Sequence, residues 1–141
     1  MIDTADGEDS DMGAAEDGEV VRRGYEAFIA GDLATLGELF ADDAVWSVPG
    51  TGVLSGMKRG RDAVLAYFGE LGSRSRGSLR VTVQDIVGGE KHTVGIHHSH
   101  ADIDGRTYDQ VTVVVFALRD GKVIEAKEFF EDQTKSDEFW G

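Results

Sequence analysis

The sequence predicts an α+β fold, with helices packed on one face of a mostly antiparallel sheet. Its 141 residues are the size of a single domain. From Glu19 to Leu71 the apolar residues recur at helical spacings of three and four. From Leu79 onward, segments rich in Val, Ile, Thr and aromatics alternate with Gly-Gly or Asp-Gly pairs, as in a β-meander. Helices followed by such a meander are typical of the α+β class.

Composition narrows the function classes. The chain carries 14 basic and 27 acidic side chains, a formal charge of −13, which argues against nucleic acid or an anionic membrane surface as partner. No apolar run reaches the roughly 20 residues that a membrane span needs. The acidic N-terminus is unlike a signal peptide, and the sequence has no cysteine for disulfides or thiolate metal sites. We expect a cytoplasmic domain.

The acidic residues are concentrated at the N-terminus. Residues 1–17 hold seven acids and no base, too polar to offset the entropy of ordering. This predicts a disordered acidic tail over 1–17 and a folded domain over 18–141. The domain then has 20 acids and 14 bases, a net −6.

The helical half divides into three helices and one strand. The first helix begins at Glu19 and ends at Gly31, and Asp32 is a good N-cap for a second, short helix. Residues 44–48 form a short strand, followed by a loop that runs to Gly60. A third helix begins at about Asp62.

Four strands are predicted over 79–87, 93–103, 107–118 and 123–130. Asp104-Gly105 and Asp120-Gly121 suit two-residue type I′ turns, in which both residues take positive φ. Counting from these turns pairs His100 with Asp109 and Val113 with Glu128. Alternation then predicts one apolar face, which should lie under the helices: Val94, Ile96, His98, His100, Asp109, Val111, Val113, Val115, Ala117, Ile124, Ala126, Glu128 and Phe130.

The ionisable residues on that face are the candidate catalytic groups. Glu128 has no basic residue opposite it, so burial would raise its pKa toward neutrality. Asp109 would orient the His100 ring, and His98 lies between that pair and Glu128. The structural alternatives stay open: Glu128 reaching water at the end of the sheet, and His100–Asp109 as a solvated cross-strand pair. Zinc would need Asp109 beside His98 and His100, and we expect no metal and no cofactor.

Several stretches together resemble the SnoaL-like branch of the nuclear-transport-factor-2-like superfamily, over about residues 19–141. They are AGDLATLGELFADDAVWSVPG, GRDAVLAYF, DGRTYD and DGKVIEAKEFFEDQTKSDEFW. The resemblance implies a cystatin-like cone, a curved sheet wrapped around the N-terminal helices with an apolar cavity at one end. It also implies a homodimer formed through the outer sheet face. Pocket walls are then expected at Trp46, Val48, Phe68, Val113 and Phe130, with Tyr25 as a polar tip.

The catalytic residues of known relatives do not carry over. The ketosteroid isomerase positions fall on Gly24, Val48 and about Val113, and the acid of SnoaL-type polyketide cyclases falls on Val113 or Val114. The Asp–Arg–Asp set of the epoxide hydrolases has no arginine on the predicted face. The fold therefore leaves the function open.

The sequence is compatible with two functions. The first is an acid–base enzyme (isomerase, cyclase, dehydratase or hydrolase) acting on a small, largely apolar, ring-containing substrate through Glu128, His98, His100 and Asp109. The alternative is a non-catalytic binding domain for a small apolar ligand.

Overall fold

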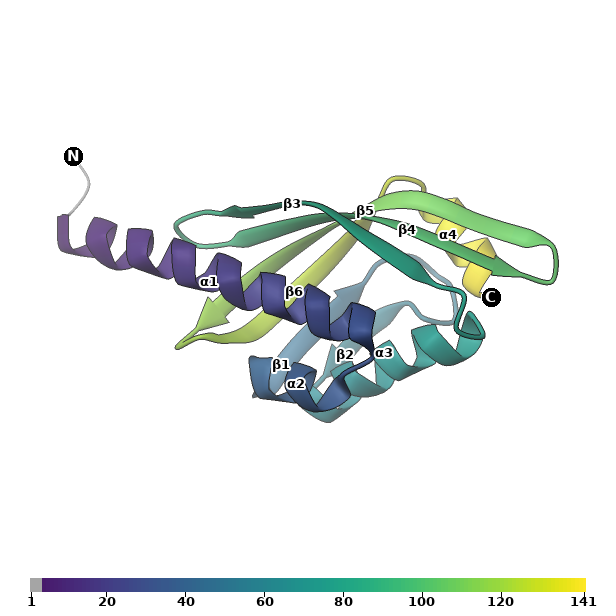
Figure 1. Ribbon diagram of the computed structural model, residues 1–141, viewed down its shortest axis with the longest axis horizontal. Coiled ribbons are helices and arrows are strands. Elements are labelled where there is room, and N and C mark those ends of the chain that lie inside the picture. Colours follow the sequence, from purple (N-terminus) through teal and green to yellow (C-terminus); the bar gives the residue numbers. More distant parts are fainter. Residues whose placement is uncertain (1–3) are drawn as a thin grey trace.

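The computed structural model describes residues 4–141, with side chains described from Gly13 onward. A six-stranded, curved sheet has the strand order β2-β1-β6-β5-β4-β3, and only the β1–β6 pair is parallel. Helices α1, α2 and α3 pack against its concave face, while α4 lies at one end against β5 and β6 (Figure 1). The predicted α+β cone is thus confirmed. Within residues 4–141, no helix is both long and apolar enough to cross a bilayer.

The helical half matches the prediction in outline. The elements are α1 (Thr4–Ala30), α2 (Leu33–Leu39), β1 (Phe40–Val48), β2 (Gly56–Arg59) and α3 (Arg61–Arg74). Asp32 caps α2 as expected, since its carboxylate accepts from the backbone N–H of Thr35 at 3.0 Å. The short edge strand β2 lies in the segment predicted to be a loop, where it pairs with β1.

The predicted start of the first helix is wrong. Helix α1 begins at Thr4 rather than Glu19, so it includes most of the acidic segment; residues 1–3 lie outside the described residues. Ala14 and Ala15 favour a helix, and the sheet supports this part of α1. A Cβ built on Gly88 would lie 2.6 Å from the Ala14 carbonyl oxygen, so helix and strand are in close contact.

The second half contains β3 (Arg80–Gly88), β4 (Thr93–Ile103), β5 (Arg106–Arg119), β6 (Lys122–Phe130) and α4 (Gln133–Trp140). Both Asp-Gly turns have positive φ at both residues, as type I′ requires. The predicted β4–β5 register is confirmed in full, including His100 opposite Asp109. The C-terminal helix α4 was not predicted.

A β-bulge in β6 overturns the predicted sheet faces. The β5–β6 register shifts between Ala117, which pairs with Glu125, and Leu118, which pairs with Val123, so Ile124 is an extra residue. Beyond the bulge, Glu128 pairs with Val114 instead of Val113. A one-residue slip moves every side chain to the other face.

The inner face therefore differs from the predicted one. Strand β6 keeps its predicted inner residues Ala126, Glu128 and Phe130, but β4 and β5 are reversed. Their inner residues, nearly all buried, are Thr93, Gly95, His97, Ser99, Ala101, Tyr108, Gln110, Thr112, Val114 and Phe116. The predicted pocket residues His98, His100, Asp109 and Val113 lie on the outer face instead, as do Val94, Ile96, Val111, Val115 and Ala117.

Candidate functional site

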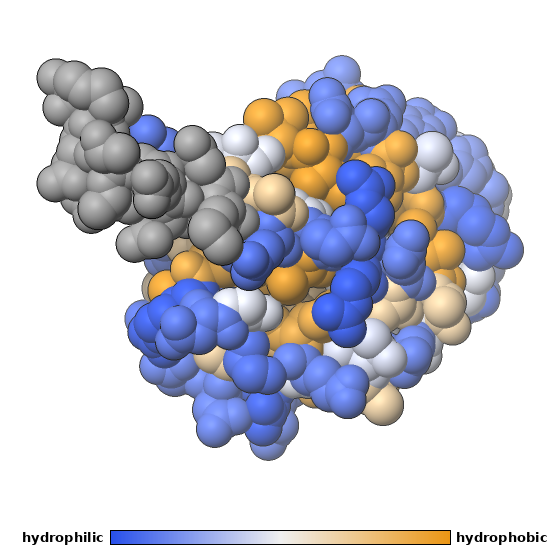
Figure 2. All heavy atoms as spheres, turned by 60° about the vertical axis from the view of Figure 1, so that its left-hand side comes forward, coloured by the Kyte–Doolittle hydropathy of each residue, from blue (hydrophilic) through white to orange (hydrophobic). Residues whose placement is uncertain are grey.

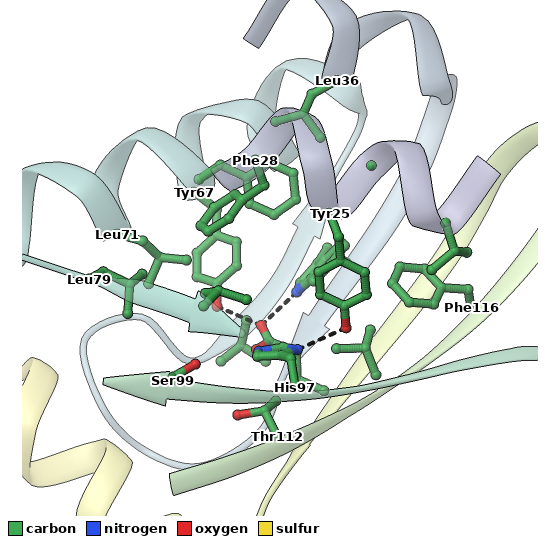
Figure 3. A pocket seen from close by; sticks show the side chains of 18 of the residues that line it. Tyr25, Phe28, Leu36, Tyr67, Leu71, Leu79, His97, Ser99, Thr112 and Phe116 are labelled. Atoms are coloured by element: carbon green, nitrogen blue, oxygen red, sulfur yellow. Dashed lines mark hydrogen bonds between the residues drawn. The ribbon is translucent and has the colours of Figure 1, made fainter. Parts of the chain in front are cut away.

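An apolar cavity of about 110 Å³ lies between the inner sheet face and the helices. Side chains from α1, α3 and strands β4 and β5 converge on it (Figure 3). Figure 2 turns forward the end of the molecule from which α1 projects, where apolar surface shows between polar side chains. Among the described residues, no lysine or arginine lines the cavity. A concave, mostly apolar pocket with a few polar groups is the usual form of a small-molecule site.

The central polar group of the cavity is the carboxyl of Glu128 on β6. Its exposed fraction is 8%, and its Oε2 accepts hydrogen bonds from Trp46 Nε1 at 2.7 Å and from the Tyr67 hydroxyl at 2.5 Å. Burial raises the pKa of Glu128, and these two donors oppose the rise only in part. The carboxyl makes no ion pair with any described residue.

The second oxygen of Glu128 is available to a ligand. Oε1 has no protein partner among the described residues. Every fully enclosed side-chain nitrogen or oxygen in that part of the chain does have a partner, so Oε1 is not fully enclosed by protein atoms. Because Glu128 lines the cavity, one oxygen is held in place while the other faces the space that a ligand would fill.

Lys58 on β2 is the cation that influences this carboxyl. Its Nζ lies 5.5 Å from the centroid of the Tyr67 ring, a cation–π distance, and is held by the Ser55 carbonyl at 3.4 Å. Its positive charge lowers the pKa of Glu128, in opposition to burial. Lys58 thus acts on the carboxyl from behind Tyr67, outside the cavity lining.

A second polar pair faces the same cavity from α1 and β4. The Tyr25 hydroxyl lies 2.8 Å from His97 Nδ1, with the two rings edge to face at 5.3 Å (Figure 3). Burial raises the pKa of Tyr25 above its ordinary range and lowers the pKa of His97 to about 4, so both groups are uncharged at neutral pH. Tyr25 fits only because Gly95 has no side chain.

Replacing Gly95 by alanine is expected to destabilise the protein by about 1–3 kcal/mol, the usual cost of overpacking a core. The new Cβ would lie 2.5 Å from the Tyr25 oxygen and 2.8 Å from its ring. Urea unfolding measures the change. Gly69→Ala in α3 is the matched control, because no atom approaches a Cβ there and alanine should stabilise the helix. Equal effects at the two sites would contradict the close packing of Tyr25.

The structure places most of the predicted wall residues around the cavity. Trp46, Val48, Phe68 and Phe130 line the cavity, as does Tyr25, whereas Val113 does not. Trp46 packs edge to face on Phe68 at a ring distance of 5.0 Å. Sequence reasoning missed His97, which it placed on the other face, and Tyr67. The spacing of three residues from Val64 could have placed Tyr67 on the buried side of its helix.

The predicted histidine–aspartate cluster exists, but on the outer face. Asp109 accepts from His98 at 2.7 Å through Oδ1 and from His100 at 2.8 Å through Oδ2. The bonds to Asp109 and Asp102 raise the pKa of His100. These groups are largely exposed and do not reach the cavity. Among the described residues, no cluster of His, Asp or Glu is arranged to hold a metal ion.

Comparison with known proteins places this architecture in a family. A model of the SnoaL-like domain matches residues 21–126. The chain belongs to the SnoaL-like family. An uncharacterized protein of Mycobacterium tuberculosis is 31% identical over 123 residues, covering 86% of this chain and 94% of that protein.

Two solved structures are similar over almost their whole length. The structure of Bal32a, from a soil-derived mobile gene cassette, is 36% identical with a TM-score of 0.88, covering 91% of this chain and 98% of that one. A Xanthomonas campestris protein of unknown function with a cystatin-like fold is 29% identical with a TM-score of 0.82, covering 87% and 96%.

Proposed function

We propose that this SnoaL-like protein is an acid–base enzyme that moves a proton on a small, largely apolar, ring-containing molecule. The observation that carries this proposal is the Glu128 carboxyl, buried in an apolar cavity with one oxygen held by Trp46 and Tyr67 and the other facing open space. A carboxyl with a pKa raised by burial is suited to exchange protons near neutral pH.

The size of the cavity supports a ring-sized substrate. Its volume is about 110 Å³, and an engineered apolar cavity of about 150 Å³ binds benzene. The aromatic walls formed by Trp46, Phe68 and Phe116 favour a flat apolar molecule. The substrate's reacting atom would lie against Glu128 Oε1.

The proposal is tested by titrating the Glu128 carboxyl carbon by ¹³C NMR, with Glu128→Gln identifying its signal. Burial predicts a pKa clearly above the ordinary value of about 4.3. Lys58→Met should raise it further, because the opposing positive charge is lost, whereas Arg59→Met on the same strand should leave it nearly unchanged. A wild-type value near 4.3 would remove the physical basis of the proposal.

A non-catalytic binding domain is the second candidate. It is favoured by the absence of the catalytic residues that the relatives named above use: their tyrosine position is Gly24 here, and their acid positions are Val48 and Val113 or Val114. In that case Glu128 only anchors a polar end of the ligand. Ligand binding without any proton exchange would identify this alternative.

The homodimer and the cytoplasmic location stay predictions. A second copy would cover the outer sheet face, which carries three apolar side chains. Two of them, Val113 and Val115, are half-buried, and the third, Phe129, is 53% exposed. Analytical ultracentrifugation measures the oligomeric state directly.

A further inference from the structure

We propose that the His97 imidazole, positioned by Tyr25, is a hydrogen-bond donor that binds an oxygen atom of the ligand. The ligand would then be an uncharged ring compound with a carbonyl or hydroxyl oxygen. This inference deepens the proposed function and rests on it for the identity of the site.

The hydrogen bond to Tyr25 determines the tautomer of the His97 imidazole. The only protein partner of the Tyr25 hydroxyl among the described residues is His97 Nδ1, at 2.8 Å. If Tyr25 donates its proton to Nδ1, the imidazole proton is on Nε2, and Nε2–H is the one donor left without a partner. If Nδ1–H instead donates to the Tyr25 oxygen, both the Tyr25 hydroxyl proton and the Nε2 lone pair are left without a hydrogen-bond partner. Unpaired buried polar groups are costly, so the first arrangement is favoured.

The Nε2–H group of His97 is the free donor, and its surroundings indicate where it can bind a ligand. His97 is 9% exposed and lines the cavity from the inner face of β4. Its Nε2 has no protein partner in the described part of the chain, and no fully enclosed side-chain nitrogen or oxygen there lacks one. Nε2 is therefore not fully enclosed, and because His97 lines the cavity, we infer that a ligand oxygen there accepts its proton.

The charges around the cavity favour an uncharged ligand. The imidazole is neutral at pH 7, because burial and the neighbouring His98 lower the pKa of His97 to about 4. Glu128 is the acidic side chain among the cavity residues, and no lysine or arginine described here joins it. A carboxylate or phosphate would find no opposite charge in this space and would meet the Glu128 carboxyl. A neutral oxygen has no such penalty.

The spacing of His97 and Glu128 limits the size of the ligand between them. His97 pairs with Thr112, and Glu128 pairs with Val114, so they flank β5 from β4 and β6. Neighbouring strands lie about 4.8 Å apart, and Thr112 and Val114 lie about 7 Å apart along β5, so the backbones at His97 and Glu128 are about 12 Å apart. With side chains converging from both, the gap suits one six-membered ring. The ring oxygen would face His97 while a ring C–H or O–H faces Glu128.

The experiment measures binding of three six-membered rings by ¹H–¹⁵N NMR titration: cyclohex-2-enone, cyclohexene and cyclohexanecarboxylate. One hydrogen bond to the enone oxygen should give about tenfold tighter binding than cyclohexene. The carboxylate should cause no shifts in the cavity. His97→Asn still offers Tyr25 an acceptor through its amide oxygen, but its shorter side chain does not carry an N–H to the position of Nε2, so the preference for the enone should be lost. His98→Asn, on the outer face, should leave it intact.

A second measurement does not depend on any variant folding correctly. Long-range ¹H–¹⁵N correlation of the wild-type imidazole should show a protonated Nε2 and an unprotonated Nδ1 at pH 7. A protonated Nδ1, a charged ring, or an enone preference that survives in His97→Asn would overturn the inference. The result is separable from the proposed function, since Glu128 titrating near its ordinary value would leave the enone preference in place.

Discussion

Replacing Glu128 by glutamine is expected to lower catalysed proton exchange on a ring ketone by about 10²–10⁴-fold, the usual contribution of a positioned acid–base group. In D₂O the carboxylate would take a proton from the carbon next to the carbonyl of cyclohex-2-enone or from its conjugated γ-carbon. It would return a deuteron after exchange with solvent. Glutamine can still accept from Trp46 and Tyr67 through its carbonyl oxygen, so the cavity should keep its shape while the proton carrier is lost.

The exchange rate is followed by the loss of the enone proton signals in ¹H NMR. Glu125→Gln is the matched control, because Glu125 is a carboxyl on the same strand that does not line the cavity. Exchange at the wild-type rate in Glu128→Gln, or equal losses in the two variants, would assign proton transfer elsewhere. No acceleration by the wild-type protein over buffer would favour the binding domain instead.

The architecture could be read from local signals. Asp104-Gly105 and Asp120-Gly121 determine two tight turns, and the turn at Asp104 correctly determines the pairing of every residue between β4 and β5. The N-cap at Asp32 and the apolar spacing were likewise sufficient to predict that α2 begins after Asp32 and that three helices precede the meander. These features depend on residues close in the chain, where sequence patterns are informative.

The assignment of sheet faces could not be derived in the same way. The extra residue at Ile124 leaves no clear mark, because valine, isoleucine and glutamate on either side fit a regular strand equally well. The apolar pattern was also misleading, since the outer face carries Val111, Val113 and Val115 while Thr112 is fully buried on the inner face. Thr112 and His97 are polar residues that line the cavity from the buried inner face, so polar character does not mark the outer face of this sheet.

The one-residue error exchanged His98 for His97 in the candidate site and left Glu128 in place. Both histidines have a hydrogen-bonding partner, but the partners have opposite effects. His97 bonds to the buried Tyr25 hydroxyl, and burial lowers the pKa of the imidazole and keeps it uncharged, whereas His98 bonds to the exposed carboxylate of Asp109. The inner face thus holds a neutral hydrogen-bonding pair, while the outer face holds histidines bonded to an exposed carboxylate, which suits an apolar ligand inside and water outside.

His97 is expected to make the protein sensitive to acid. Its pKa is lowered to about 4 in the folded state, against about 6.5 when unfolded. Between these values the unfolded chain binds more protons, so the free energy of unfolding falls as the pH falls from about 6.5 through 4. The full shift corresponds to about 3 kcal/mol. Glu128 contributes with the opposite sign, because its pKa is raised and its stabilising effect is lost as the pH rises.

Urea unfolding at pH 7, 5.5 and 4 separates the two contributions. His97→Asn has no imidazole to protonate at this position yet keeps an acceptor for Tyr25, so it should lose much less stability on acidification than the wild type. His98→Asn should retain most of the wild-type loss, because burial, the larger cause of the lowered pKa of His97, is unchanged in that variant. If His97→Asn lost stability as steeply as the wild type, the imidazole would not be held neutral in the folded protein. The neutral donor that the ligand subsite requires would then be absent, so this measurement on the empty protein also bears on what the cavity can bind.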